Sequence, residues 1–275
     1  MMELTAKNIT VRRGGRTILD RLSVCLRSDQ ITAIIGPNGS GKSTLLHALA
    51  GLLPLGDGLV FLDGRRIDRI ARRLLAKDLA ILSQHPEAPE GLNLREVVAH
   101  ARFAHHRLWE PLSDQDRKIV QEALERTRIL DLADRPFSQL SGGERQRGWI
   151  ALTLAQAPRM LLLDEPTSHL DVGHQTQVLA LLKQLRQTAG PGLVIVLHDI
   201  NHAGLLADRI LAMKEGKIIT DGVPKDVIHP DMMRQLFDAQ VDVFETRDGR
   251  PYCIPAGLFN GVDPGFCPSK DVSAI

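Results

Sequence analysis

The chain has 275 residues, of which 34 are Lys or Arg and 33 are Asp or Glu, so its formal charge at pH 7 is +1. A charge this close to zero gives no general electrostatic case for nucleic acid as a main partner. The length suffices for a sizeable buried core in one large domain or two ordinary ones. The longest aliphatic stretches, such as residues 193–197, are about a quarter of the ~20 residues needed to cross a bilayer, so we expect no membrane span.

The N-terminus and the cysteines bear on the cellular compartment. The first seven residues, Met-Met-Glu-Leu-Thr-Ala-Lys, lack the apolar core of a secretory signal. Cys25, Cys253 and Cys267 are odd in number and widely separated, without the spacing of a metal site. We therefore expect a cytosolic protein with free thiols.

The apolar pattern predicts an α/β fold. Alternating residues with glycine turns predict antiparallel strands over residues 4–26 and 58–64. Continuously apolar runs over 30–35, 160–163 and 193–197 predict the buried strands of a parallel sheet, with helices between them. No repeat with a period of about 20 to 50 residues is present, which argues against a solenoid or a propeller.

Residues 65–77 carry six basic residues and one acidic residue, Asp68. The basic residues follow a helix-like pattern whose opposite face is apolar, with Ile67, Ile70, Leu74 and Leu75. This pattern predicts a solvated helix. A surface close to anionic lipid headgroups is the alternative.

Helical spacing replaces short strands between about residues 88 and 157. Ser113 and Asp116 have the spacing of a capping box, and the residues after them repeat at helical intervals: Ile119, Ala123, Leu124 and Thr127. This segment is predicted to be a helical subdomain.

The C-terminal part is predicted to be an extension of the main domain. Residues 1–240 form the main domain in this division, and 241–275 form the extension. Within the extension, Phe244 to Ile254 has the pattern of a hairpin that turns at Asp248-Gly249. Proline and glycine residues then break any regular pattern, so we expect the last ~15 residues to be mobile.

A glycine-rich motif directly follows the first apolar run. It consists of Gly36, Pro37, Asn38, Gly39, Ser40, Gly41, Lys42, Ser43 and Thr44, and a helix-like segment follows it. Glycines let the backbone curl until many N–H groups converge on a phosphate chain, and the helix adds its positive end. The motif predicts a P-loop, in which Lys42 reaches the β and γ phosphates of a nucleotide and Ser43 binds Mg²⁺. The alternative is a glycine turn that merely begins a helix.

Two adjacent carboxylates, Asp164 and Glu165, follow the apolar run 160–163. A P-loop needs a second carboxylate for Mg²⁺ at the end of another strand. We assign Asp164 to the metal shell, and Glu165 to orienting and deprotonating the attacking water. An acidic strand end without such a role is the alternative. These motifs alone fit any P-loop nucleoside triphosphatase.

A third motif narrows the class of protein. Ser141, Gly142 and Gly143 stand at the predicted start of a helix, which gives a second group of backbone donors suited to phosphate. With this motif, residues 3–240 resemble the ATP-binding subunit of ABC transporters. The resemblance implies a head-to-tail homodimer, in which the Ser-Gly-Gly signature of one subunit caps the ATP held by the P-loop of the other.

The resemblance also implies roles for three further residues. It places Gln84 at the Mg²⁺ and the water and in signalling to membrane subunits, Asp171 at the dimer seam, and His198 on the γ-phosphate. From the residues alone, His198 stands out because it directly follows a buried strand, whereas Gln84 would be an ordinary loop residue. Three other histidines are not metal-site candidates, because no carboxylate or cysteine pattern accompanies them: His105, His106 and His169.

One position departs from the family pattern. The family usually stacks adenine on an aromatic residue before a Gly-Gly-like turn, and here Arg13 precedes Gly14-Gly15. The planar guanidinium is able to stack on the base. The residues leave open whether it does so or whether the slot is empty.

Other kinds of ABC protein fit the chain less well than a transporter subunit. The interval between Gln84 and Leu140 is too short for the coiled coils of repair proteins, and translation factors carry two cassettes. Four stretches resemble importers of ferric siderophore, haem and cobalamin, which is an analogy at the family level. They are residues 112–116, 143–152, 170–175 and 198–203 with 207–209.

The resemblance therefore implies an import motor at the cytoplasmic face of the cell membrane, as a peripheral protein. Its partners would be a second copy, integral permease subunits and, indirectly, a periplasmic or extracellular substrate-binding protein, with no nucleic acid. Its ligands would be ATP and Mg²⁺. The alternatives are a soluble ABC ATPase without a permease, a subunit for another substrate, and an exporter, against which the stretch 201–209 argues. The permease would contact the region of Gln84 and residues 94–103, unless Leu94, Val97 and Val98 are only helical core.

Overall fold

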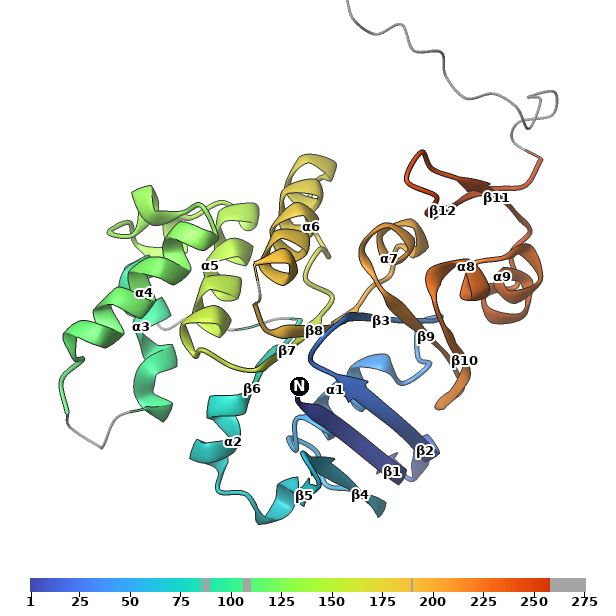
Figure 1. Cartoon of the computed structure of the whole chain (residues 1–275), viewed down its shortest axis with the longest axis horizontal. Coiled ribbons are helices and arrows are strands. Elements are labelled where there is room, and N and C mark those ends of the chain that lie inside the picture. Colours follow the sequence, from blue (N-terminus) through green and yellow to red (C-terminus); the bar gives the residue numbers. More distant parts are fainter. Residues whose placement is uncertain (85, 87–89, 106–109, 189, 258–275) are drawn as a thin grey trace, which may run out of the picture.

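A six-stranded sheet forms the centre of the molecule (Figure 1). The structure is a computed structural model, and it describes residues 1–84, 86, 90–105, 110–188 and 190–257. The strand order is β10-β9-β3-β8-β7-β6, and all neighbours are parallel except β10 and β9. The strands are β3 (Ile31–Ile35), β6 (Leu79–Leu82), β7 (Met160–Asp164), β8 (Gly192–Val196), β9 (Arg209–Lys214) and β10 (Lys217–Gly222). Every residue of β3, β7 and β8 is buried, as continuous apolar runs predict. The predicted parallel core is confirmed.

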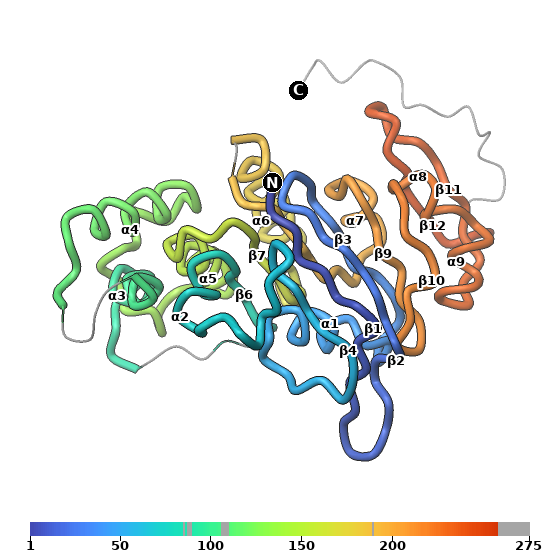
Figure 2. Tube along the Cα trace, turned by 60° about the horizontal axis from the view of Figure 1, so that its bottom comes forward, coloured from blue at the N-terminus to red at the C-terminus, as the bar shows by residue number. Residues whose placement is uncertain are grey.

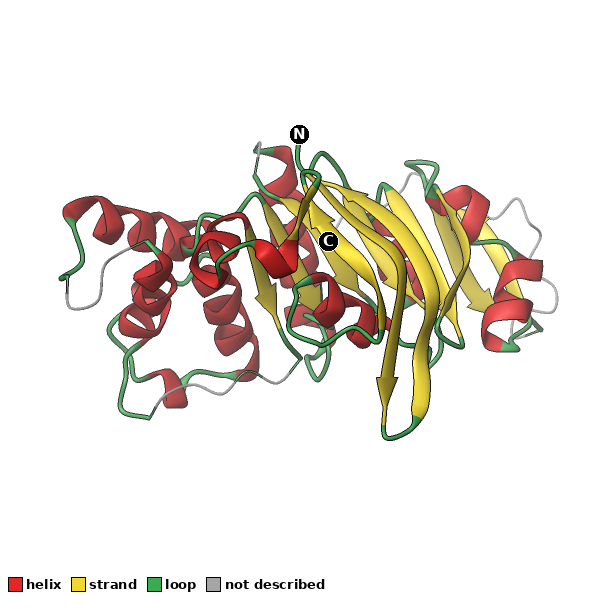
Figure 3. Cartoon of the chain, turned by 90° about the horizontal axis from the view of Figure 1, so that it is seen from below, coloured by secondary structure: helices red, strands yellow, loops and turns green. Residues whose placement is uncertain are grey.

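An antiparallel sheet of order β2-β1-β4-β5 lies beside this core. Its strands are β1 (Glu3–Arg13), β2 (Arg16–Arg27), β4 (Asp57–Leu62) and β5 (Arg65–Arg66). Leu4 of β1, Leu45 of helix α1 (Lys42–Leu49) and Leu162 of β7 share one hydrophobic cluster, so α1 is packed between the two sheets. Figure 3 shows the long β1-β2 hairpin projecting beyond the other strands. The predicted antiparallel flank is confirmed.

Residues 65–77 do not form one helix, so this expectation is wrong for its first half. Arg65 and Arg66 form β5 and pair with the end of β4, and a single turn, η1 (Ile67–Arg69), follows. Only α2 (Arg72–Asp78) is helical, and on it Leu74 is 52% exposed whereas Leu75 is buried. Pairing with the edge of β4 overrides the local helical spacing, as tertiary contacts commonly do.

Helices replace strands at one end of the molecule (Figures 1 and 2). They are α3 (Leu94–Ala99), η2 (His100–Ala104), α4 (Asp114–Arg126), η3 (Leu130–Leu132), η4 (Phe137–Gln139) and α5 (Gly142–Ala155). Ser113 caps α4 in the predicted capping box with Asp116. The buried Arg102 side chain donates to Asp116 Oδ1 (2.8 Å) and to the Ala155 carbonyl oxygen (2.8 Å), which ties η2 to both α4 and α5.

The C-terminal elements lie at the other end (Figures 1 and 2). The chain passes from α6 (Val172–Gln187) through β8 to α7 (Ile200–Leu206), and after β10 it continues with α8 (Pro224–Val227), α9 (Pro230–Phe237), β11 (Val241–Glu245) and β12 (Pro251–Pro255). Strands β11 and β12 form an antiparallel hairpin beside α7. The expectations for His106, Cys267 and the C-terminal tail lie outside the described residues.

No helix within the described part of the chain combines the length and the apolar character that a bilayer span requires.

Candidate active site

The glycine-rich loop curls around its own lysine at the carboxyl end of β3. Lys42 Nζ donates to the carbonyl oxygens of Gly36 (2.9 Å) and Pro37 (3.0 Å). A Cβ on Gly36 would lie 2.1 Å from the Met213 carbonyl oxygen, so a larger residue does not fit there. Gly41 is the N-cap residue of α1 and has φ of 98°, which directs the first turn of that helix into the loop.

Two polar groups of this loop are buried in a way that suits an anionic ligand. Burial lowers the pKa of the Lys42 ammonium, and the nearby Glu165 and Asp164 carboxylates oppose that shift. The Ser40 hydroxyl is buried and has no hydrogen-bond partner among the described residues. A buried cation and an unpaired donor are groups that phosphate oxygens would satisfy.

Asp164 lies directly against the P-loop. Ser43 Oγ donates to Asp164 Oδ1 at 2.9 Å, and His47 Nε2 is 3.9 Å from Asp164 Oδ2. Burial raises the pKa of the Asp164 carboxyl, and the hydrogen bond from Ser43 opposes this effect. A hydroxyl and a carboxylate side by side are hard oxygen ligands of the kind that Mg²⁺ takes, so the two residues fit the ion assigned to them.

Glu165 is held by two other predicted site residues. His198 Nε2 is 2.5 Å from Glu165 Oε1, and Gln84 Nε2 donates to Glu165 Oε2 at 2.5 Å. The backbone of Glu165 is left-handed, with φ of 53°. The three residues follow β6, β7 and β8, which are neighbours in the sheet, and the carboxyl ends of parallel strands are where α/β proteins place ligand-binding groups.

The remaining predicted residues lie elsewhere. Ser141 caps α5, where its Oγ accepts from the backbone N of Glu144 (3.3 Å), and Asp171 caps α6. Among the described residues, no hydrogen bond or ion pair links Ser141, Gly142, Gly143 or Asp171 to the P-loop group. Arg13 is exposed at the end of β1. One chain therefore supplies two separate parts of the predicted ATP site.

Sequence reasoning missed His47 and Ser83. His47 is on α1, four residues after Ser43 and so on the same face of the helix, and its Nε2 is 3.5 Å from Ser83 Oγ. That spacing is the signal that could have found it. These two side chains connect the Asp164 carboxylate to the segment that leads to Gln84.

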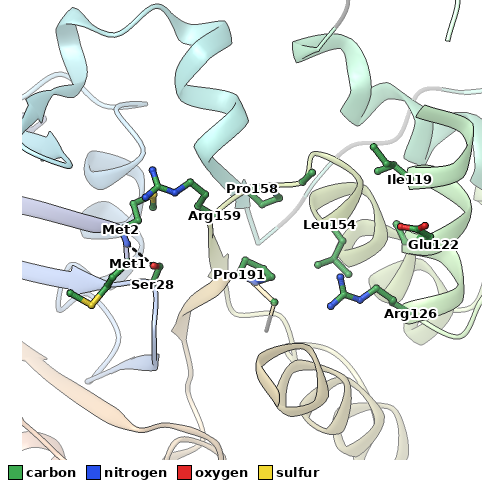
Figure 4. A pocket seen from close by; sticks show the side chains of 13 residues that line it. Met1, Met2, Ser28, Ile119, Glu122, Arg126, Leu154, Pro158, Arg159 and Pro191 are labelled. Carbon is green, nitrogen blue, oxygen red and sulfur yellow. Dashed lines mark hydrogen bonds between the residues drawn. The ribbon is translucent and has the colours of Figure 1, made fainter. Parts of the chain in front are cut away.

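A cavity of about 470 Å³ lies at the amino ends of the central strands, opposite the P-loop (Figure 4). Its lining includes Ser28, Arg159 and Pro191, which precede β3, β7 and β8, and Glu122 and Arg126 of α4. The P-loop and Glu165 follow the carboxyl ends of these strands. The cavity is therefore separate from the candidate active site.

The family model described as ABC transporter matches residues 19–168, which is more than half of the chain. The chain belongs to the ATP-binding cassettes of ABC transporters. Members of this family bind and hydrolyse ATP, so the cassette is an ATPase.

Similar proteins match almost the whole cassette. It is 41% identical over 260 residues to the iron(3+)-hydroxamate import ATP-binding protein FhuC of Bacillus subtilis, covering 94% of this chain and 96% of the relative. It is 39% identical to the hemin import ATP-binding protein HmuV of Rhodococcus jostii, covering 88% of this chain and 82% of the relative. A solved dimeric bacterial ABC transporter cassette superposes with a TM-score of 0.70 at 29% identity, covering 80% of this chain and 98% of that one.

Proposed function

We propose that the cassette is the ATP-hydrolysing motor of an importer for an iron chelate, either a ferric siderophore or haem. It would work as a homodimer bound to permease subunits at the cytoplasmic face of the membrane, with a substrate-binding protein as an indirect partner. The observation that carries the catalytic part is the Glu165 carboxylate, with one oxygen against His198 and the other against Gln84. The cargo rests on relatives that match nearly the full length and import iron chelates.

We assign Mg²⁺ to Ser43, Asp164 and Gln84. The amide nitrogen of Gln84 donates a hydrogen bond to Glu165, so its carbonyl oxygen stays available as a third hard oxygen ligand for the ion. When bound, the ion neutralises charge on the phosphate oxygens.

The other site residues then act on the nucleotide and on water. Lys42 moves its hydrogen bonds from the Gly36 and Pro37 carbonyls to phosphate oxygens, and the unpaired Ser40 hydroxyl gains an acceptor. The Glu165 carboxylate orients the attacking water and takes its proton, and Gln84 holds one of its oxygens. His198, beside the other oxygen of Glu165, contacts the γ-phosphate. Ser141, Gly142 and Gly143 of a second copy cap the nucleotide, because a single chain keeps them apart from its own P-loop.

We propose the same division of the chain as the sequence predicts. Residues 1–240 are the ATP-binding domain, with a helical subdomain at about 88–157, and 241–275 are an extension. Leu94, Val97 and Val98 are fully buried and therefore belong to the helical core. Phe103 is 68% exposed, so we assign the permease contact to it and to the segment around Gln84. Replacing Phe103 with Ala should abolish transport and leave ATP hydrolysis intact.

The catalytic assignment is tested with Glu165→Gln. This variant should bind ATP, hydrolyse it at least ~100-fold more slowly because it lacks the general base, and accumulate as an ATP-bound dimer. Lys42→Ala is the control for binding, since it should lose ATP affinity and stay monomeric. Near-normal turnover by Glu165→Gln would remove Glu165 from its role.

The cargo is tested by uptake of radiolabelled ferric siderophore, haem and cobalamin in cells that carry either the wild type or Lys42→Ala. Loss of siderophore or haem uptake in the mutant supports the proposal. Loss of cobalamin uptake alone, or persistence of all three, shows that the cargo is wrong. A cassette that does not fractionate with membranes would favour a soluble ABC ATPase instead.

A further inference from the structure

His174 joins the two parts of the chain that the proposed dimer presents to a second copy. It lies in the first turn of α6, three residues after Asp171. Its backbone N donates to Asp171 Oδ1 at 2.8 Å, and its Nδ1 is 2.7 Å from Asp171 Oδ2. A carboxylate only accepts hydrogen bonds, so Nδ1 carries the hydrogen. One residue thus occupies both oxygens of Asp171.

The opposite side of the His174 ring, at Cδ2, lies against Gly143 of the Ser141-Gly142-Gly143 signature, which we call the signature turn. A Cβ built on Gly143 would be 1.9 Å from Cδ2 of His174 and 2.5 Å from its Cγ. The ring therefore packs on the Cα of Gly143, in the first turn of α5, where only glycine leaves room. At Gly142 the nearest atom to such a Cβ is 3.9 Å away, so the close approach belongs to Gly143 alone.

This contact crosses between the helical subdomain and the sheet core. Helix α5 begins with the signature and belongs to the helical subdomain, whereas α6 follows β7. One turn further along both helices, Arg147 donates to Gln177, so the two helices are joined at a second point. The hydrogen bonds from the His174 backbone N and ring also hold the pKa of Asp171 below its ordinary value.

We propose that His174 is a positioning residue that holds the signature turn and the Asp171 loop as one unit. A second copy would then meet both elements in a fixed relative orientation. The inference rests on the proposed function, since it needs both elements to face the nucleotide of the other subunit. Without His174, the signature turn and Asp171 would each have to be ordered when the dimer closes, which weakens closure.

Three substitutions separate the two contacts of His174. His174→Asn keeps a donor near the place of Nδ1 but removes the ring from Gly143. His174→Phe keeps a ring on Gly143 but removes the donor to Asp171. His174→Ala removes both. In addition, Gly143→Ala should clash with the ring, and the double variant Gly143→Ala/His174→Ala removes that clash.

The test is ATP-dependent dimer formation in the Glu165→Gln background, measured by sedimentation velocity. We expect His174→Ala to raise the ATP concentration for half-maximal dimer at least ~5-fold, the lower end of typical coupling between sites. The Asn and Phe variants should fall between it and the parent. The ATP Kd of the monomer, measured at a protein concentration too low for dimers, should not change, because the P-loop is untouched.

The double variant provides a readout that a general loss of stability does not produce. Gly143→Ala should dimerise worse than the parent, and adding His174→Ala should partly restore dimer formation. If the parent and the His174→Ala variant form dimers at the same ATP concentration, this inference is overturned and the proposed function is not affected. A double variant no better than Gly143→Ala also overturns it. A parent that stays monomeric with ATP overturns the proposed dimer and this inference with it.

Discussion

Asn201 and Cys253 form a pair of hydrogen bonds between α7 and the C-terminal hairpin. Asn201 Oδ1 accepts from the backbone N of Cys253 at 2.7 Å, and Asn201 Nδ2 donates to the Cys253 carbonyl oxygen at 3.0 Å. The side-chain amide thus satisfies the edge of β12 as the backbone of a neighbouring strand would. Asn201 lies three residues after His198, so the extension is anchored to the first turn of the helix that follows the active-site histidine.

Two further contacts support this anchor. A Cβ on Gly204 would lie 2.7 Å from the Pro251 carbonyl oxygen, so α7 and β12 approach closely at a glycine. Arg250 Nη1 donates to the Ala207 carbonyl oxygen at 2.5 Å, just after α7 ends. The hairpin therefore contacts α7 at its beginning, middle and end.

Asn201→Ala should detach the hairpin. The variant removes two hydrogen bonds to the backbone of the buried Cys253, so we expect a loss of about 1–3 kcal/mol in the local stability of the hairpin. Hydrogen exchange of the β12 amides measures this loss. Lys225→Ala is the control, since it removes an ion pair to Glu245 in which both side chains are more than half exposed, and should change exchange by less than ~1 kcal/mol. Equal protection in Asn201→Ala and wild type would refute the anchor.

The Cys253 thiol should react slowly in the folded protein. Burial, and secondarily the charge of Asp199, raise the pKa of this thiol to about 11. A raised pKa means less thiolate, so at pH 8 its thiolate fraction is roughly 100-fold below that of a free cysteine. Iodoacetamide labelling of a chain with Cys25 and Cys267 changed to Ser measures the rate, with the denatured chain as control. Asn201→Ala should raise the rate, and fast labelling of the intact protein would contradict the buried position.

Gly36→Ala should disrupt the P-loop even without nucleotide. Its Cβ would meet a backbone carbonyl oxygen at 2.1 Å, and backbone atoms move only with the strands that carry them. We expect overpacking to lower the melting temperature by about 5 °C or more. Gly14→Ala is the matched control, because Gly14 also has positive φ but has nothing within 4 Å of a Cβ. If both variants have the same melting temperature, the close contact at Gly36 does not determine the conformation of the P-loop.

The sequence predicts the fold class and the P-loop because both depend on local patterns. Buried strands appear as continuous apolar runs, and a phosphate loop needs glycines at fixed short intervals before a Lys. Strand β6 is a continuously apolar run as short as the run 160–163, and it is not among the strands predicted from the sequence. The helix predicted over 65–77 fails where Arg65 and Arg66 pair with β4, a contact that no local spacing encodes.

The site is predicted less completely than the fold. The end of a buried strand supplies Glu165, and resemblance supplies the roles of Gln84 and His198, but neither shows that the Glu165 carboxylate contacts the other two side chains. His174 and Gly143 both lie in stretches that resemble importers of ferric siderophore, haem and cobalamin, yet they are far apart in the chain. Only the packing of α5 against α6 reveals that the His174 ring occupies the space next to the Cα of Gly143.

Substitutions of Arg13 test whether its guanidinium replaces the aromatic residue on which the family usually stacks adenine. Arg13 is exposed beside the Gly14-Gly15 turn, so it is free to cover a planar base, and cation–π stacking there would contribute about 0.5–1 kcal/mol. Arg13→Ala should then weaken ATP binding by about two- to fivefold in calorimetric titration. Arg12→Ala removes the same charge from the preceding residue, also exposed, and should leave the Kd nearly unchanged. If the two variants weaken binding equally, the effect is one of general charge; if neither does, the adenine position is empty. Arg13→Trp should bind ATP at least as well as wild type if the position stacks on the base, because an indole ring provides a larger face.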